Sequence, residues 1–404
     1  MLWIYDIGIA LYVAFVKIAA LFNYKAKLFI EGRKNIFEII STQINSNDKP
    51  IWFHFASLGE FEQGRPVLER IKSINPSEKI VITFFSPSGY EIRKNYAGAD
   101  GIFYLPVDTA KHAKKFIALV NPKLAIFTKY EFWFHYFDVL HQAKIPLYLI
   151  SGIFRPKQAF FKWYGGFNRR MLRKVTHFFV QNEESVRLLA QIGIDNVSLS
   201  GDTRFDRVYE NALQAKKIPE IEMFCKNSPV FIAGSTWPAD EKLLALFPEK
   251  HPDWKLIIAP HEIEISHITD IEKLFPKAIK YTALQAQTPN LLPQTLIIDN
   301  IGMLSSLYQY GNVAYIGGGF GSGIHNTLEA AAFGLPVIFG PKYDKFQEAK
   351  DLIAIGAAKS IINETALLSA FEYFSEKEKA SADAKKYVEE KKGATEMIIK
   401  KINF

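Results

Sequence analysis

One glutamate stands where a predicted strand gives way to a helix, in the segment Ser57-Leu-Gly59-Glu60. The preceding apolar residues 51–55 predict a buried strand, and Gly59 would let a substrate come close to the backbone. A carboxylate in this place can take the proton from an attacking hydroxyl group, which is general-base chemistry. Glu60 can equally complement the positive end of the helix dipole, and its position alone favours neither role.

Glycines gather at another predicted strand end, late in the chain. The sequence from Tyr315 to Ala330 reads YIGGGFGSGIHNTLEA, and Gly334-Leu-Pro-Val follows. Bare backbone N–H groups and a helix N-terminus expected near His325 predict a phosphate site that needs no metal, while Glu329 could accept hydrogen bonds from ribose hydroxyls. The alternative is a glycine-rich turn that only packs a helix on a sheet. The candidate residues are Gly318, Gly319, Gly323, Asn326 and Glu329.

Two shorter motifs also follow predicted strands. Ser235 and Thr236 come after residues 230–233, where their hydroxyl groups could bind phosphate or carboxylate oxygens or simply cap a helix. Pro260 and His261 come after the next strand, where the histidine could contact a nucleotide base or phosphate or serve the structure alone. His, Cys and acidic residues show no clear metal-ligand spacing, so neither a metal nor a cofactor is expected.

A basic stretch rich in aromatic residues occupies residues 155–174. It contains seven Lys or Arg residues, among them Arg155, Arg169 and Arg170, and five aromatic side chains, but no Asp or Glu. Cations beside aromatic rings suit an anionic membrane surface or a phosphorylated lipid, and they also suit single-stranded nucleic acid. The plainer interpretation is a solvated helix face with some core aromatics.

The N-terminus is apolar, and between Leu2 and Phe22 the charged residues are Asp6 and Lys17. No basic residue precedes the apolar run and no clear small-residue cleavage site follows it, so a secretory signal is not expected. We expect a membrane anchor over residues 1–28 that either spans the bilayer or lies in its interface, with the cations that follow it on the cytoplasmic side. The alternative is a helix packed on the protein's own core.

Composition and patterning indicate a two-domain globular protein. The chain has 404 residues, of which 49% are hydrophobic, and its net charge of +7 permits an anionic partner without naming one. The single Cys225 excludes an internal disulfide.

Continuous apolar segments that alternate with helical patterns predict parallel strands buried on both faces. The predicted strands are 51–55, 80–85, 102–105, 124–127, 147–150, 177–180 and 197–200, then 230–233, 256–259, 296–298, 313–316 and 337–339.

The fold class expected from this pattern is α/β, with two Rossmann-like domains whose parallel sheets face a central cleft and whose binding motifs follow the strands. The boundary is expected in the charged, proline-containing stretch 206–228, which gives domains of residues 29–210 and 211–404. The residues from Glu376 onward, rich in Lys, Glu and Ala, predict an exposed helix.

Taken in this order, the motifs resemble those of the Kdo transferases, which pass 3-deoxy-D-manno-octulosonic acid (Kdo) from CMP-Kdo to the lipid A precursor of Gram-negative lipopolysaccharide. The resemblance runs from the apolar N-terminus and Ser-x-Gly-Glu, through Glu131-x-Trp133, to Gly-x-Pro-Val and Gly-Pro. It implies a GT-B fold and inverting, metal-independent transfer to lipid IVA. It also implies a location on the cytoplasmic face of the inner membrane and no nucleic-acid partner.

The resemblance assigns roles to individual residues. Glu60 would be the general base, residues 29–210 the acceptor domain and residues 211–404 the donor domain. The nucleotide site would contain Ser235, Thr236, Pro260, His261, Gly318, Asn326 and Glu329. The acceptor candidates are Ser57, Gly59, Glu131, Arg155, Arg169 and Arg170.

Two motifs depart from the family pattern. Many members read Glu-x-Glu-x-Trp-Pro, where this chain has Lys129 and Phe134 in place of the first Glu and the Pro. Many read Pro-Arg-His, and the missing Arg could be replaced by Arg204, Arg155 or Lys342. One competing interpretation is a GT-B transferase or epimerase that uses a UDP-sugar. Another is a membrane-bound protein that binds nucleotides or nucleic acid without catalysis.

Overall fold

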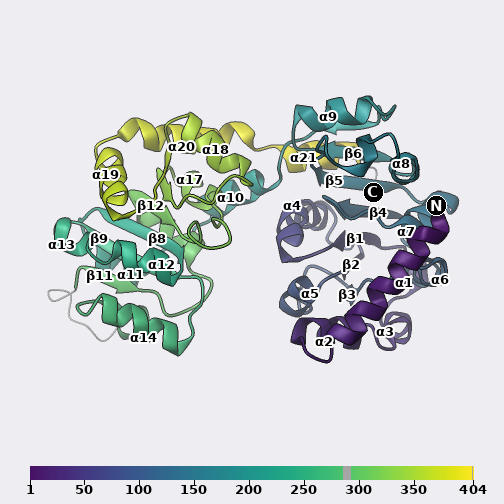
Figure 1. Ribbon diagram of the computed structural model, residues 1–404, viewed down its shortest axis with the longest axis horizontal. Coiled ribbons are helices and arrows are strands. Elements are labelled where there is room, and N and C mark those ends of the chain that lie inside the picture. The colour runs from purple at the N-terminus through teal and green to yellow at the C-terminus, as the bar shows by residue number, and fades with distance from the viewer. Residues whose placement is uncertain (285–292, 403) are drawn as a thin grey trace. The chain divides into compact units, whose positions relative to one another are not determined.

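The computed structural model describes residues 1–284, 293–402 and 404, and the chain divides into two compact units. Unit 1 comprises residues 1–206 and 392–404, and unit 2 comprises residues 207–391. Each unit is built on one seven-stranded sheet in which all neighbouring strands run parallel, with helices packed around it (Figure 1). The prediction of two Rossmann-like α/β domains is confirmed.

The sheet of unit 1 has the order β3-β2-β1-β4-β5-β6-β7. Its strands are β1 (Ile51–Phe55), β2 (Ile80–Phe84), β3 (Gly101–Tyr104), β4 (Leu124–Thr128), β5 (Leu147–Gly152), β6 (His177–Val180) and β7 (Val197–Leu199). The chain moves outward from β1 to β3 and then returns to the other side of β1 as β4. The direction of travel therefore reverses between β1 and β4, which is the switch point at which open α/β sheets bind ligands beyond the carboxyl ends of their strands.

Successive residues of β1 point to opposite faces of this sheet, as the twofold repeat of a strand requires. Trp52 belongs to the core on one face, whereas Ile51, Phe53 and Phe55 belong to the core on the other. Two buried faces explain why the strand is apolar apart from His54. The helices of unit 1 are α1 (Leu2–Ala19), α2 (Tyr24–Glu31), α3 (Ile36–Gln43), α4 (Leu58–Ile74), α5 (Pro87–Arg93), α6 (Ala110–Val120), α7 (Phe134–Gln142), α8 (Gly166–Leu172), α9 (Glu183–Ala190) and α21 (Ala394–Lys401).

The sheet of unit 2 has the order β10-β11-β9-β8-β12-β13-β14. As in unit 1, the direction of travel reverses once, and this switch point lies between β8 and β12. Its strands are β8 (Val230–Thr236), β9 (Lys255–Pro260), β10 (Ile279–Lys280), β11 (Thr295–Ile297), β12 (Val313–Ile316), β13 (Val337–Phe339) and β14 (Ala358–Ser360). The sequence did not predict β10 and β14, because these two short edge strands each contain a lysine and no apolar run.

The helices of unit 2 lie before, between and after these strands. They are α11 (Pro219–Cys225), α12 (Pro238–Leu244), α13 (Phe247–Lys250), α14 (Ile265–Leu274), α15 (Tyr281–Leu284), α16 (Leu304–Leu307), α17 (Leu328–Ala332), α18 (Gln347–Ala354), α19 (Glu364–Ser375) and α20 (Glu378–Lys391). Helix α10 (Arg204–Leu213) contains the junction of the two units at residues 206 and 207.

The C-terminal residues are helical and mostly exposed, as predicted, but they form two helices with buried stripes and do not all belong to the second domain. Helix α20 buries Ala384 and Tyr387 within unit 2. Helix α21 returns to unit 1, where Ile398 joins the core beside α4. Asp206 fixes the start of α21 by accepting hydrogen bonds from the N–H of Gly393 and from the N–H and hydroxyl of Thr395. The sequence did not predict the second helix or its return to unit 1, because the apolar stripes are short and only packing determines what they contact.

Helix α1 is long and apolar enough to cross a membrane by length and composition alone. In Figure 1 it runs along the outside of unit 1, from beside α7 toward α2. The Tyr5 hydroxyl donates to Asp108 at 2.5 Å, and Asp6 pairs with His135 on α7 at 2.6 Å. The helix therefore lies against its own domain over one of its faces.

Candidate functional site

Glu60 lies in the first turn of α4, directly beyond the carboxyl end of β1 at the switch point of unit 1. Ser57 occupies the N-cap position, and the N–H of Ala56 donates to Oε2 of Glu60 at 2.5 Å. The side chain is half-buried. Burial, reinforced by the negative charge of Glu131, raises the pKa of Glu60 to about 7, against the opposing effects of the Ala56 N–H and Lys129. The group can therefore exchange a proton near neutral pH.

Glu131 is held by two rings at the carboxyl end of β4, the other strand of the switch point. Its Oε2 accepts a hydrogen bond from Nε1 of Trp133 at 2.8 Å and lies 3.0 Å from Nε2 of His54. His54 is fully buried in β1, and its Nδ1 lies 2.8 Å from the Thr83 hydroxyl on β2. This chain of contacts fixes the carboxylate whose charge raises the pKa of Glu60.

The sequence predicted Glu131 but missed His54. The histidine stands within an apolar strand, and its partner is 77 residues away, so spacing alone does not join them. A polar ring inside an otherwise apolar strand is the available signal, because a buried polar group needs a partner. Lys129, which replaces the first Glu of the family motif, has a positive φ of 58° and contributes positive charge near Glu60.

The basic stretch 155–174 divides into structural and exposed parts. Arg169 is half-buried and donates from Nη1 to the carbonyls of Phe160 and Lys162 at 3.0 and 2.9 Å, so it holds its own loop together. Arg155 and Arg170 are exposed, and their guanidinium groups lie 5.9 Å from the Tyr130 ring and 5.6 Å from the Phe167 ring. Of the aromatics, Phe160, Phe161 and Phe167 belong to or pack on the core of unit 1, whereas Trp163 and Tyr164 are exposed.

In unit 2 the glycine turn after β12 is anchored by Asp240, a fully buried residue of α12. Its carboxylate accepts hydrogen bonds from the Tyr315 hydroxyl at 2.6 Å, the Gly318 N–H at 2.9 Å and the Trp237 N–H at 3.0 Å. Burial raises the pKa of Asp240 even so. The sequence noted Asp240 after the Gly-Ser-Thr motif but gave it no role.

Close packing accounts for much of the glycine content of this turn. A Cβ on Gly317 would collide with the backbone of Ser235, and one on Gly319 would collide with that of Gly340. Most N–H groups of the turn donate within the protein: those of Gly317, Gly318, Gly321, Gly323, Ile324 and His325. The following helix, α17, begins at Leu328 rather than near His325 and has five residues. The sequence predicted a phosphate site made of bare N–H groups and of a helix that starts near His325. Both features differ in the structure, because most of the N–H groups are engaged and the helix starts later.

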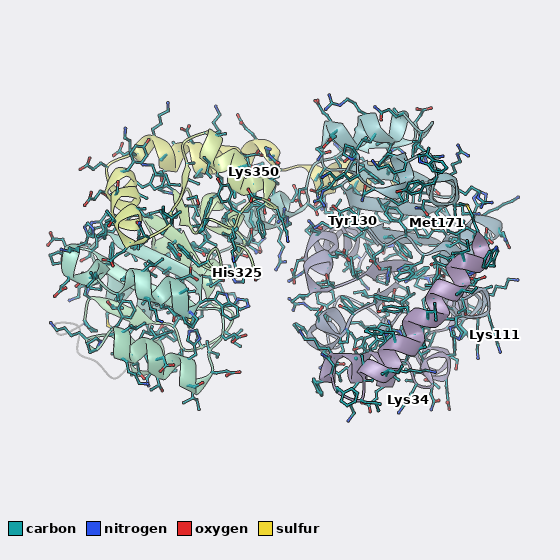
Figure 2. All side chains as sticks on the ribbon, viewed as in Figure 1. Lys34, Lys111, Tyr130, Met171, His325 and Lys350 are labelled. Atoms are coloured by element: carbon teal, nitrogen blue, oxygen red, sulfur yellow. The ribbon has the colours of Figure 1, made fainter. Side chains whose placement is uncertain are left out.

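Three rings stack beside the turn. His261 and His325 have ring centroids 4.2 Å apart, and Trp237 lies over His261 at 5.0 Å. Nε1 of Trp237 donates to Nε2 of His325 at 3.0 Å. Burial and the neighbouring His261 lower the pKa of His325 to about 4, so the ring is neutral at physiological pH. His325 is labelled in Figure 2. Trp237, which the sequence did not single out, completes this group.

The remaining predicted donor residues surround the stack and the turn. Ser235 has a positive φ of 53° at the end of β8, and the Thr236 hydroxyl donates to Glu241 at 2.9 Å. Thr236 pairs with Pro260 across β8 and β9, and its carbonyl accepts the N–H of His261 at 3.0 Å. These contacts bring Ser235, Thr236, Pro260 and His261 together at one end of the sheet.

Asn326 and Glu329 meet at the start of α17. Nδ2 of Asn326 donates to Oε1 of Glu329 at 3.1 Å. Burial raises the pKa of Glu329, while Asn326 and Arg207 oppose the rise. The carboxylate can accept hydrogen bonds from vicinal hydroxyl groups, and the neighbouring amide can donate a hydrogen bond to them or accept one.

Three cations were expected to replace the missing arginine, and the structure places them differently. Arg204 forms an ion pair with Asp202 at 2.7 Å, and Arg155 stacks on Tyr130, both within unit 1. Lys342 belongs to unit 2 and is exposed, and its Nζ donates to the Gly321 carbonyl at 2.7 Å. Lys342 is therefore the cation of the three that touches the glycine turn.

Residues 31–207 match the family model of 3-deoxy-D-manno-octulosonic-acid transferase (kdotransferase). The chain is similar to the 3-deoxy-D-manno-octulosonic acid transferase of Aquifex aeolicus, with 28% identity over 79% of this chain and 84% of that protein. It is also similar to the enzyme of the same name from Chlamydophila psittaci, with 27% identity over 76% of this chain and 73% of that protein.

Among solved structures, the chain resembles UDP-GlcNAc 2-epimerase from Neisseria meningitidis bound to UDP-GlcNAc. The TM-score is 0.59 with 18% identity, over 87% of this chain and 98% of the epimerase, which indicates a shared fold. A fold of this kind hosts several activities, so family assignment depends on the sequence. The chain therefore matches the Kdo transferase family model over residues 31–207 and is similar to Kdo transferases, which are glycosyltransferases, along most of its length.

Proposed function

We propose that this protein transfers Kdo from CMP-Kdo to the lipid A precursor lipid IVA, with inversion at the anomeric carbon. The observation that carries the proposal is Glu60, a half-buried carboxylate at the switch point of unit 1 whose pKa is raised to about 7. In this mechanism Glu60 is the general base. Unit 1 binds the acceptor, and unit 2 binds the donor.

The raised pKa of Glu60 suits a base that works at neutral pH. A carboxylate of ordinary pKa is ionised but weakly basic, whereas one near 7 is both substantially ionised and a stronger proton acceptor. Glu60 removes the proton from a primary hydroxyl of the lipid's glucosamine as the oxygen attacks the anomeric carbon of Kdo. The bond from that carbon to the CMP phosphate oxygen breaks, and CMP leaves.

The donor is assigned to unit 2 because its switch point offers contacts for each part of a nucleotide. The stacked rings of Trp237, His261 and His325 provide a neutral aromatic wall. Glu329 accepts hydrogen bonds from the ribose, next to Asn326. Lys342, beside the glycine turn, neutralises the phosphate in place of the family's arginine. We propose that the leaving phosphate is stabilised by these groups without a metal ion.

The acceptor is an anionic, acylated lipid, and the features of unit 1 suit such a molecule. Arg155 and Arg170 are exposed cations beside aromatic rings, in the same segment as the exposed Trp163 and Tyr164. Ser57 and Gly59 are neighbours of Glu60 in the chain, and the charge of Glu131 acts on Glu60. We propose that the protein works on the cytoplasmic face of the inner membrane, where helix α1 and the basic segment meet the lipid.

The proposal is tested by transfer of labelled Kdo from freshly generated CMP-Kdo to lipid IVA, with Glu60→Ala in parallel. Wild-type transfer and its loss in the variant are expected. A wild-type protein that transfers nothing and binds UDP more tightly than CMP would overturn the donor assignment and favour a UDP-sugar.

The ribose contact has its own test in unit 2. Glu329→Ala is expected to weaken CMP binding measured by calorimetry, because it removes an acceptor for the ribose hydroxyls. The matched control is Glu249→Ala, which removes an exposed glutamate on α13. An unaltered CMP affinity in Glu329→Ala would remove Glu329 from the nucleotide site.

A further inference from the structure

Helix α1 has two apolar faces, and unit 1 covers one of them. Tyr5, Ile9, Val13 and Val16, which recur at helical spacing, are buried or half-buried against the domain. Ile4, Ile7, Leu11, Phe15 and Ile18 form the opposite face, and each is at least half exposed. A helix that is apolar all round is normally buried on every side or surrounded by lipid. Here the outward face of α1, defined by those five residues, has no cover in the described parts of the chain.

The docked face is attached along the length of the helix. Near its start, the Tyr5 hydroxyl bonds to Asp108 and Asp6 pairs with His135. Further along, the Tyr12 ring lies 6.0 Å from Phe29 and 6.1 Å from Phe85. A helix fastened in this way cannot cross a bilayer unless Asp108, His135 and the folded domain around them enter the hydrocarbon as well, and buried polar groups of that kind are costly there.

The segment that follows α1 is basic and begins with exposed apolar residues. Beyond α1 the apolar surface continues through Leu21 and Phe22, which are 76% and 88% exposed. Lys17, Lys25, Lys27 and Lys34 are exposed, with Glu31 as the one acidic residue from 17 to 34. Lys34 is labelled in Figure 2. Arg33 is not part of this charge, because it is half-buried and donates to the carbonyls of Phe29, Phe85 and Leu105.

The other end of α1 adjoins the basic stretch 155–174. The Tyr5 ring lies 5.8 Å from Phe167 on α8, and the Phe134 ring stacks on Phe167 at 4.9 Å. Trp163, in the loop that leads into α8, is 91% exposed. The structure therefore joins two features that are far apart in the sequence. Apolar residues flanked by lysines, with an exposed tryptophan nearby, match the chemistry of an anionic bilayer surface.

We infer that α1 lies flat in the headgroup region of an anionic bilayer, inserts its outward face and does not cross the membrane. This deepens the membrane location in the proposed function and rests on it. The acyl boundary of the bilayer covers the outward face, while the docked face keeps unit 1 at a fixed depth and orientation. Lysines beside the helix contact lipid phosphates.

The depth of labels along one face distinguishes this arrangement from a spanning helix. Ile4→Cys, Leu11→Cys and Ile18→Cys place three labels on the outward face, seven residues apart. The native Cys225 is buried and its pKa is raised to about 12, so it reacts poorly with thiol reagents. Ile265→Cys, at an exposed position of unit 2, is the control that stays in water.

In full-length protein bound to phosphatidylcholine–phosphatidylglycerol vesicles, lipid-borne quenchers are expected to reach all three α1 labels at one shallow depth. A label at position 11 near the bilayer centre, with 4 and 18 near opposite surfaces, would show a spanning helix and overturn the inference. Labels as water-exposed as Ile265→Cys would overturn it too, and would favour a protein partner for the outward face.

A binding measurement provides a second test. The double variant Leu11→Glu/Phe15→Glu is expected to weaken vesicle binding at least about tenfold, because two apolar side chains no longer enter the acyl boundary. The control, Ile265→Glu/Ile362→Glu, changes two similarly exposed residues of unit 2 and is expected to leave binding within about twofold. Equal loss in both variants would overturn the inference.

These measurements contain neither donor nor acceptor, so their failure is distinguishable from failure of the proposed function. Kdo transfer to detergent-dispersed acceptor is measured separately on the same variants. Loss of vesicle binding with transfer retained in detergent is the result expected for Leu11→Glu/Phe15→Glu.

Discussion

The two units share one sheet plan, yet their switch points are chemically unlike. At the switch point of unit 1, Glu60 and Glu131 come close enough for the charge of one to raise the pKa of the other. In unit 2 the buried carboxylates Asp240 and Glu241 bond inward to the framework, and the neutral ring of His325 lies beside the glycine turn. The same strand order therefore places residues at the switch point of each sheet, but the side chains there differ. Unit 1 has two interacting carboxylates, and unit 2 has carboxylates bonded within the protein beside neutral rings.

The base assignment predicts the largest effect. Glu60→Gln is expected to lower the rate of Kdo transfer by about 10²–10⁴-fold, since a positioned general base contributes that much. CMP affinity, which depends on unit 2, is expected to stay the same. Single-turnover transfer and calorimetric CMP binding measure the two separately. If both fell together, the contrast between the units would be lost.

Stability provides a control for this variant. The pKa of Glu60 is about 7 in the folded protein, above its ordinary 4.5, so the folded state binds the proton more tightly than the unfolded chain does. Glu60 therefore destabilises the fold progressively as pH rises from 4.5 through 7. Glu60→Gln, which removes the charge, is expected to unfold no more easily than wild type at pH 8, so that misfolding would not explain lost transfer.

Removing the carboxylate of Asp240 in unit 2 is expected to destabilise the protein, in contrast to the removal of the Glu60 charge. Asp240→Ala leaves the Tyr315 hydroxyl and the N–H groups of Gly318 and Trp237 without their acceptor, and is expected to destabilise the protein by about 2–4 kcal/mol. CMP binding is expected to weaken with it, because the glycine turn loses its anchor. Denaturant unfolding and calorimetry measure both effects. A variant as stable as wild type would contradict the role of Asp240 in holding the turn.

Part of this contrast could be predicted from the sequence. Apolar runs followed by Gly59-Glu60 or by Ser235-Thr236 place those residues at strand ends, because local pattern decides the strand and the turn. The links between distant segments could not be predicted. His54 meets Glu131 and Trp237 meets His325 only once strands pair, across 77 and 88 residues of chain. Such pairings depend on packing, which spacing does not encode.

The hydrogen bonds of the glycine turn could not be predicted from the sequence either. Its sequence predicts free N–H groups. Whether an N–H group is free depends on whether folding brings a hydrogen-bond acceptor next to it. Asp240 and carbonyls within the turn engage most of these donors. The return of α21 to unit 1 likewise depends on Asp206, which lies 189 residues before Thr395.

The electrostatic coupling in unit 1 predicts a shift in pH dependence. Glu131→Gln keeps an acceptor for Trp133 but removes the charge that raises the pKa of Glu60. The pKa of Glu60 is then expected to move down from about 7 toward its ordinary value, so the acid limb of the rate profile shifts to lower pH. Transfer rates from pH 5 to 8 measure this. An unmoved acid limb would mean that burial alone sets the pKa of Glu60.

The smallest effect is expected from the ring stack of unit 2. Trp237→Phe keeps an aromatic ring over His261 but removes the Nε1–H that donates to His325. One hydrogen bond is worth about 1 kcal/mol, so CMP affinity is expected to fall roughly fivefold, with the pH profile of transfer unchanged. Trp254→Phe, at a tryptophan packed on Phe371 elsewhere in unit 2, is the matched control. If Trp237→Phe moved the pH profile and left CMP affinity intact, the stack would take part in proton transfer, and the division of labour between the two switch points would fail.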